Sequence, residues 1–238
     1  MTLNERIQSV RERIDRAAVQ AGRDPGEITL CAATKVQTDE TIRAAIAGGI
    51  RVCGENRVQE LTAHLDADAY AGAEAVHFIG HLQTNKVNKV VGRVDLIQSV
   101  DSSRLLAAID KQAGKLELVQ DILLEVNIGG EASKGGCPVA ELRALVDEAK
   151  AMEHVRLRGL MAIPPVSAIP GANIPYFAAM RELFIDIGGK IADNQSIINC
   201  LSMGMSADFT DAVAQGATLV RVGTALFGPR PAPAVSRN

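Results

Sequence analysis

One lysine occupies a position that suits covalent chemistry. Lys35 directly follows ITLCAAT, residues 28–34, an apolar run with the composition of a buried strand. A charged amine is costly to bury at the end of such a strand, so its pKa is expected to fall and its amine to become nucleophilic. A nucleophilic lysine can form a Schiff base with a carbonyl compound. The alternative is a lysine whose stem packs on apolar surface while its ammonium reaches solvent.

Two stretches of small residues have the composition of an anion site. Ser202-Met203-Gly204 closes one apolar run, and Gly223-Thr224-Ala225 closes the next. Small residues and hydroxyls allow backbone N–H groups to approach a phosphate, often at the start of a short extra helix. Tight packing of two turns is the alternative. Because both stretches share this composition, we favour a phosphate site.

The other polar candidates have less defined roles. Asn56 and His81 each follow an apolar run, and His81 is either a base or ligand contact or a hydrogen-bonded structural histidine. No metal site is indicated, because His77 and His81 would lie roughly 13 Å apart on a strand. The remaining basic side chains are interpreted as structural or solvated groups: His64, His77, His154, Lys86, Lys89 and Lys134.

The elements that must position these residues alternate between helix and strand. The first helical pattern covers residues 2–21 and starts with a capping box at Thr2 and Glu5. Gly114 is expected to end a helix and Ser206 to begin one. Apolar strands are expected at residues 28–34, 50–53, 76–80, 94–100, 118–128, 155–163, 196–203 and 217–223.

Eight strands alternating with helices predict an α/β protein built as a (β/α)₈ barrel. The alternative is a Rossmann-like sheet, but no G-x-G-x-x-G follows the first strand. In a barrel the carboxyl ends of the strands form one face. We therefore expect Lys35, Asn56, His81, Ser202 and Gly223 to gather there.

Composition excludes several classes of protein. The chain has 238 residues, a net charge of -3 and 47% hydrophobic residues, so it is neither disordered nor a dedicated nucleic-acid binder. No apolar run approaches the roughly 18 residues of a membrane span. The N-terminus lacks the apolar core of a signal peptide, and the four cysteines are interpreted as reduced thiols. These features predict a cytoplasmic protein.

A reactive lysine opposite a phosphate site suggests two chemistries. One is a Schiff-base aldolase that acts on a sugar phosphate. The other is a pyridoxal 5'-phosphate (PLP) site, in which the cofactor aldehyde joins the lysine and its phosphate occupies the small-residue loops. These residues alone do not decide between the two.

Longer segments of the sequence decide between these two chemistries, because they resemble a known family. Residues 32–60, 77–90 and 201–228, with the motifs GENRVQE, IGHLQTNK and SMGMSAD in order, closely resemble the pyridoxal phosphate homeostasis protein family. That family is similar to the N-terminal barrel of alanine racemase, and the resemblance runs from about residue 2 to 230. Two positions depart from it: Thr34 stands where family members usually have Ser, and Arg57 where Tyr is common.

The resemblance implies a fold and a cofactor site. It implies a single TIM barrel over residues 1–230 with a tail at 231–238. Lys35 would hold PLP as an internal aldimine. Ser202, Gly223 and Thr224 would surround its phosphate, and Arg221 would lie near the pyridine nitrogen. Asn56 and His81 would line the pocket.

The function implied by the resemblance is intracellular PLP homeostasis rather than catalysis. The protein would buffer or deliver the cofactor, with PLP-requiring apo-enzymes as partners and effects on amino-acid and keto-acid pools. A guanidinium beside the pyridine nitrogen disfavours protonation of the ring. We also expect neither the second domain nor the tyrosine base of a racemase, because Tyr70 and Tyr176 follow no strand, and we expect a monomer. The rivals are a PLP-dependent racemase or lyase, and a protein-binding barrel without a cofactor.

Overall fold

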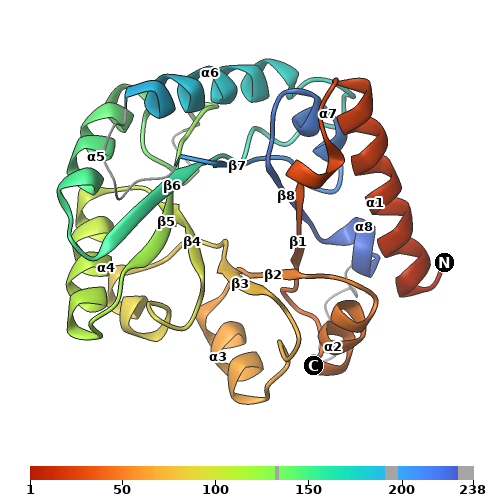
Figure 1. Ribbon diagram of the computed structural model, residues 1–238, viewed down its shortest axis with the longest axis horizontal. Coiled ribbons are helices and arrows are strands. Elements are labelled where there is room, and N and C mark those ends of the chain that lie inside the picture. Colours follow the sequence, from red (N-terminus) through yellow and green to blue (C-terminus); the bar gives the residue numbers. More distant parts are fainter. Residues whose placement is uncertain (132–133, 191–197, 230–238) are drawn as a thin grey trace, which may run out of the picture.

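Eight parallel strands close into a barrel in the computed structural model, which describes residues 1–131, 134–190 and 198–229 (Figure 1). Each strand pairs with its neighbours in sequence, and the last pairs with the first. The strands are β1 (Thr29–Ala33), β2 (Val52–Glu55), β3 (Ala75–Phe78), β4 (Leu96–Val100), β5 (Gln120–Glu125), β6 (Val155–Met161), β7 (Cys200–Ser202) and β8 (Leu219–Val222). The predicted (β/α)₈ barrel is confirmed.

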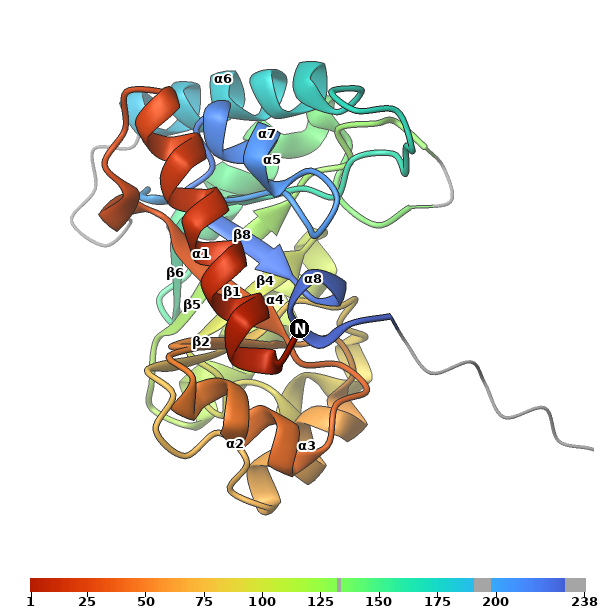
Figure 2. The same ribbon diagram turned by 90° about the vertical axis from the view of Figure 1, so that its right-hand side faces the viewer.

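Helices surround this barrel on the outside. They are α1 (Leu3–Gln20), α2 (Asp39–Ala47), α3 (Val58–Asp66), α4 (Ser103–Lys115), α5 (Val139–Ala151), α6 (Ile174–Lys190), α7 (Phe209–Ala214) and α8 (Thr224–Phe227), with 3₁₀ turns η1 (Pro25–Glu27) and η2 (Thr84–Lys89). The predicted capping box at Thr2 and Glu5 is present at the start of α1. Figure 2 shows α1 lying along the outside of β1 and β8, close to α7 and α8.

Several boundaries differ from the sequence expectations. Gly114 lies inside α4, because the helix continues to Lys115. Asp208, not Ser206, precedes the first residue of α7. His154 lies between α5 and β6 instead of in a helix. The start of the strand predicted at 196–203 lies outside the described residues. The predicted tail at 231–238 also lies outside them.

The strands divide their side chains between two cores. Outward-facing residues such as Ala32, Cys53 and Ile97 join the large core between strands and helices. Inward-facing residues such as Cys31, Val52 and Leu219 form a small apolar cluster inside the barrel. Because side chains alternate along a strand, the inward set continues toward the carboxyl ends with polar groups: Gln98, Glu125, Ser202 and Arg221.

Three further observations bear on the excluded classes. Among the described residues, no helix is both long and apolar enough to cross a membrane. The four cysteines are free thiols, three of them buried. No group of His, Cys, Asp and Glu in the described part of the chain has the arrangement of a metal site.

Candidate functional site at the carboxyl ends of the strands

Register sets five of the predicted site residues on or just after the adjacent strands β1, β2 and β8: Lys35, Asn56, Arg221, Gly223 and Thr224. Cys31 of β1 pairs with Arg221 of β8, and Ala33 pairs with Gly54 of β2. Two residues further along each strand, Lys35 lies beside Asn56, and Gly223 lies beside Ala33. The sequence expectation that these groups share one face of the barrel agrees with this pairing.

The turn that carries Lys35 is held on both sides by carboxylates from the next strand and helix. Thr34 Oγ1 donates to Glu55 Oε1 at 2.6 Å, and the Val36 N–H donates to Glu60 Oε2 at 2.9 Å. Val36 has φ of 59°, which is unfavourable for a β-branched residue. The bond from Glu60 therefore stabilises a backbone conformation that Val36 would otherwise avoid.

Glu55 is the centre of a buried polar cluster that sequence reasoning did not identify. Its carboxylate has no exposed surface and accepts hydrogen bonds from Thr34 and from the hydroxyl of Tyr70 at 3.1 Å. His64 Nε2 lies 3.8 Å from it, and His64 Nδ1 lies 2.6 Å from Asp39 Oδ1. Burial raises the pKa of Glu55, and the hydrogen bond from Thr34 opposes that shift. This cluster supports the Lys35 turn from outside the barrel.

Asn56 and His81 lie at the same end of the barrel in different environments. Asn56 Oδ1 is buried and accepts no hydrogen bond from any residue that the structure describes. The side chain of His81 is 67% exposed, with Nδ1 4.0 Å from Asp101 Oδ2. The segment before His81 passes close to the backbone of Asn56. Gly80 allows this close contact, because a Cβ there would lie 2.0 Å from the carbonyl oxygen of Asn56. Asn56 is therefore a pocket-lining candidate with an unused acceptor, while His81 lies at the rim.

Arg221 and Ser202 lie inside the barrel, below the turns. Arg221 is almost fully buried; it donates to Ser202 Oγ and, through Nη2, to the carbonyl of Ala162 at 2.9 Å. Ser202 has no exposed surface and donates to Gln98 Oε1 at 2.6 Å. The Ser202 hydroxyl thus serves Arg221 and Gln98, so the phosphate role expected for it stays a prediction.

Ser206 is the hydroxyl that faces the Gly223 turn. Its Oγ accepts from the Gly223 N–H at 3.1 Å and from the Ala225 N–H at 3.2 Å. Thr224 between them is exposed. These backbone donors converge where the sequence predicted a phosphate site. The sequence signal for this contact was Ser206, the second serine of SMGMSAD. Its position just before an apolar helix suggested a helix N-cap instead.

A buried carboxylate was also missed. Glu125, at the end of β5, points into the barrel on the same side as Arg221 and is only 8% exposed. Burial raises its pKa, and the charge of Arg221 opposes that shift. The sequence expectation places the fifth strand within residues 118–128 with Asn127 after its end, so Glu125 fell inside the expected strand. Lys134, expected to be solvated, instead donates to the carbonyl of Pro164 at 3.0 Å.

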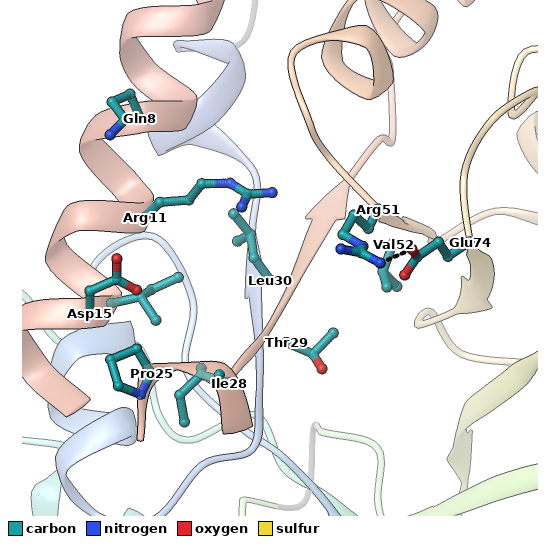
Figure 3. A pocket seen from close by; sticks show the side chains of 12 residues that line it. Gln8, Arg11, Asp15, Pro25, Ile28, Thr29, Leu30, Arg51, Val52 and Glu74 are labelled. Atoms are coloured by element: carbon teal, nitrogen blue, oxygen red, sulfur yellow. Dashed lines mark hydrogen bonds and ion pairs between the residues drawn. The ribbon is translucent and has the colours of Figure 1, made fainter. Parts of the chain in front are cut away.

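Hollows elsewhere on the molecule do not coincide with these residues. A groove of about 730 Å³ lies between α1, η1 and the amino ends of β1 and β2 (Figure 3). Its charged side chains include Arg11, Asp15 and the ion pair of Arg51 with Glu74. A smaller cavity of about 310 Å³ lies at the amino ends of the strands and is lined by His77, Asp95 and Asp121. Both are remote from the strand ends that carry Lys35 and Gly223.

Comparisons with known proteins show to which family the chain belongs. The family model of the alanine racemase N-terminal domain matches residues 8–231. A pyridoxal phosphate homeostasis protein of Aquifex aeolicus is 43% identical over 230 residues, which is 97% of this chain and 99% of that protein. One of Pseudomonas aeruginosa is 40% identical and covers 96% of each chain.

Solved structures extend the likeness to three dimensions. PipY of Synechococcus elongatus, solved with PLP bound, is 35% identical with a TM-score of 0.82, covering 95% of this chain and all of that one. Near-complete coverage in both directions, together with identity well above 30%, decides the relationship. The chain belongs to the family of pyridoxal phosphate homeostasis proteins, which is built on the alanine racemase N-terminal domain.

Proposed function

We propose that this protein binds PLP at the carboxyl ends of the strands and takes part in intracellular PLP homeostasis. The observation that carries the proposal is the placement of Lys35, Asn56 and the Gly223 turn at the carboxyl ends of three adjacent strands, β1, β2 and β8, in a barrel whose relative PipY was solved with PLP bound. When bound, PLP supplies an aldehyde that combines reversibly with a primary amine. In this proposal Lys35 provides that amine.

The residues present fit the cofactor. The N–H groups of Gly223 and Ala225 already converge on one oxygen, that of Ser206, as a phosphate oxygen would require. Asn56 Oδ1 is a buried acceptor without a partner, so it can receive a hydrogen bond from a polar group in the pocket. We therefore assign Gly223, Thr224 and Ser206 to the phosphate and Asn56 to the pocket wall, with His81 at its rim.

Arg221 supports a role in holding PLP over one in catalysis. A guanidinium has only donors and keeps its charge, so beside a pyridine nitrogen it disfavours ring protonation. An unprotonated ring withdraws electrons less well from a bound amino acid. Arg221 is anchored below the turns by Ser202 and the Ala162 carbonyl, which fixes the guanidinium near the path of Lys35.

Borohydride trapping tests the proposal. Purified protein is mixed with PLP, its absorption spectrum is recorded before and after reduction with borohydride, and the labelled peptide is mapped. We expect one adduct on Lys35, lost in Lys35→Ala and retained in Lys89→Ala, whose side chain is exposed. An adduct on Lys86, Lys89 or Lys134 instead, or no adduct in the parent protein, would contradict the assignment.

Finer parts of the function belong to the same proposal. We propose that residues 1–230 form the PLP-binding domain and 231–238 a tail, and that the protein acts as a cytoplasmic monomer. PLP-requiring apo-enzymes are its proposed recipients. Mixing PLP-loaded protein with an apo-aminotransferase checks delivery: recovery of aminotransferase activity should outpace release of PLP into buffer. Equal rates would favour buffering of free PLP over delivery.

A further inference from the structure

Four buried side chains form a continuous hydrogen-bonded chain through the barrel. Arg221 donates to Ser202 Oγ, and Ser202 donates to Gln98 Oε1 at 2.6 Å. Gln98 Nε2 lies 2.9 Å from His77 Nδ1. The chain runs from β8 through β7 and β4 to β3, so it crosses the interior instead of following neighbouring strands. It links the carboxyl ends, where Lys35 lies, to the cavity at the amino ends, which His77 lines.

The chemistry of the four groups allows only one direction of donation. Arginine has donors and no acceptor, so Ser202 Oγ must accept from Arg221. The one hydroxyl hydrogen of Ser202 then points at Gln98, which must present its carbonyl oxygen there. The amide nitrogen consequently faces His77 and can only donate. His77 Nδ1 must therefore carry a lone pair, and the histidine is neutral with its proton on Nε2.

A reversed amide would break the chain. With the Gln98 nitrogen toward Ser202, the serine oxygen would accept from two donors and its own hydrogen would lose its acceptor within the chain. A buried polar hydrogen without a partner is unfavourable. The charge on Arg221 thus determines the orientation of Gln98 and, through it, the protonation of His77.

The surroundings of His77 are consistent with the neutral form. Burial lowers the pKa of His77 to about 4, and the charge of Asp95 opposes that shift. Asp121, Arg158 and Glu27 are the other charged groups lining the same cavity, and Asp121 pairs with Arg158 at 2.7 Å. In the tautomer that the hydrogen-bonded chain requires, the proton of His77 is on Nε2, on the side of the ring away from Gln98.

We propose that Gln98 is a positioning residue for Arg221. Through Ser202 it fixes the guanidinium in one orientation beneath the Lys35 turn, and its amide makes His77 the neutral Nε2–H tautomer at the opposite end of the barrel. The role toward the PLP ring rests on the proposed function; the relay itself does not. A substitution of Gln98 should therefore alter both the orientation of the Arg221 guanidinium and the tautomer of His77, on opposite sides of the barrel.

Nuclear magnetic resonance of the cofactor-free protein tests the relay directly. Long-range ¹H–¹⁵N spectra report the tautomer of His77, and the side-chain Nη signals of Arg221 report whether its guanidinium rotates. We expect the Nε2–H tautomer at pH 7 and separate Nη signals in the parent protein. A protonated His77, or a proton on Nδ1, would overturn the proposal.

Two substitutions of Gln98 separate positioning from packing. Gln98→Met keeps the volume but removes both hydrogen bonds, so the Arg221 Nη signals should merge and His77 should populate both tautomers. Gln98→Glu still accepts from Ser202 but cannot donate, so Arg221 should stay ordered while His77 moves its proton to Nδ1. The control is Ser99→Ala on the same strand, because Ser99 Oγ is buried without a hydrogen-bond partner.

PLP titration gives the second readout. Gln98→Met should weaken PLP binding about tenfold, as expected for a misplaced charged donor, and shift the absorption of the bound cofactor. Ser99→Ala should match the parent protein. Unchanged Arg221 signals and unchanged PLP affinity in Gln98→Met would overturn the proposal. If the parent protein binds no PLP, the proposed function fails and the cofactor-free spectra decide the relay. If Gln98→Met does not fold, Gln98→Glu tests the link to His77, and a His77 proton that stays on Nε2 in that variant would overturn the proposal.

Discussion

At the scale of single residues, the structure explains how the chain accommodates Thr34, where the family resemblance leads us to expect Ser. The hydroxyl of Thr34 donates to the buried carboxylate of Glu55. Either residue supplies that donor. The methyl group of Thr34 lies in a fully buried position, so the substitution adds packing without removing the bond.

Substitutions of Thr34 can separate the contribution of its hydroxyl group from that of the shape of its side chain. Thr34→Ser should change the free energy of unfolding little, whereas Thr34→Val leaves Glu55 without its shortest donor and should cost about 1–3 kcal/mol. Urea unfolding at pH 7 measures both variants. Equal stabilities for Val and Thr at this position would mean that Glu55 is protonated and does not require that donor.

Gly223 offers a test of the phosphate turn. It has φ of -118°, so alanine is conformationally acceptable, and a Cβ there would contact Ala33 at an ordinary 3.5 Å. Gly223→Ala should therefore fold normally. The added methyl would lie beside Ala33, on the turn proposed to hold the phosphate, so we expect PLP binding to weaken about tenfold or more. Gly130→Ala, in another loop, is the control. Alanine there should strain the backbone, because φ is 65°, but PLP binding should match that of the parent protein.

At the scale of elements, α3 controls the turn that carries Lys35. Glu60 in its first turn accepts from the Val36 N–H and pairs with Arg57, the second departure from the family, at 3.1 Å. Arg57 is well exposed, and such surface pairs contribute little to stability. The bond to Val36 has a different role, because it holds a strained backbone.

Glu60→Ala and Arg57→Tyr should therefore behave differently. Glu60→Ala should accelerate hydrogen exchange of the Val36 amide and slow capture of PLP by Lys35, because the turn loses its tether. Arg57→Tyr should leave the free energy of unfolding within about 0.5 kcal/mol of the parent value. Exchange measured by mass spectrometry checks the first effect. A Val36 amide that exchanges equally fast in both variants would contradict it.

Elements were easier to predict from sequence than contacts. All eight strands appear near their expected positions, because short apolar runs between helical patterns carry a local signal. Lys35 was found from its position after an apolar run and Arg221 from the family resemblance, and the register places Arg221 beside Cys31 on the strand that leads to Lys35. The Glu55 cluster and the Ser206 contact were missed, since each joins residues on different elements and depends on how helices and loops pack. Periodicity does not contain that information.

At the scale of the whole molecule, buried titratable groups couple stability to pH. The folded protein holds His77 neutral with a pKa of about 4, below the ordinary value of 6.5 in an unfolded chain. Between these values the unfolded state binds more protons, so stability should rise with pH across this window and become flat above it.

The contribution of His77 can be isolated. Over the full window it amounts to about 3 kcal/mol at most. His77→Asn still presents an acceptor to Gln98 but does not titrate, so its free energy of unfolding should rise less between pH 4.5 and 7 than that of the parent. Denaturant unfolding at several pH values measures both. Parallel curves would show that His77 is charged in the folded protein or titrates normally.

The thiols provide a check on the whole core. Burial raises the pKa of Cys53 to about 12 and that of Cys137 to about 11, and Cys31 is completely buried. Thiolates are the reactive form, so the native protein should react slowly with Ellman's reagent, and the unfolded protein should release four equivalents. Rapid reaction of two or more thiols in native protein would contradict the described packing.

Ring closure also has a consequence for synthesis on the ribosome. β1 emerges early but finds one of its two partners, β8, only when almost the whole barrel has been translated. Until then Lys35 exists without Arg221 or Gly223, and β1 presents an unpaired edge that favours aggregation. A nascent or truncated chain therefore has Lys35 but not the donors around it. In the proposed site, full binding of PLP has to wait until β8 and the Gly223 turn have emerged and closed the ring.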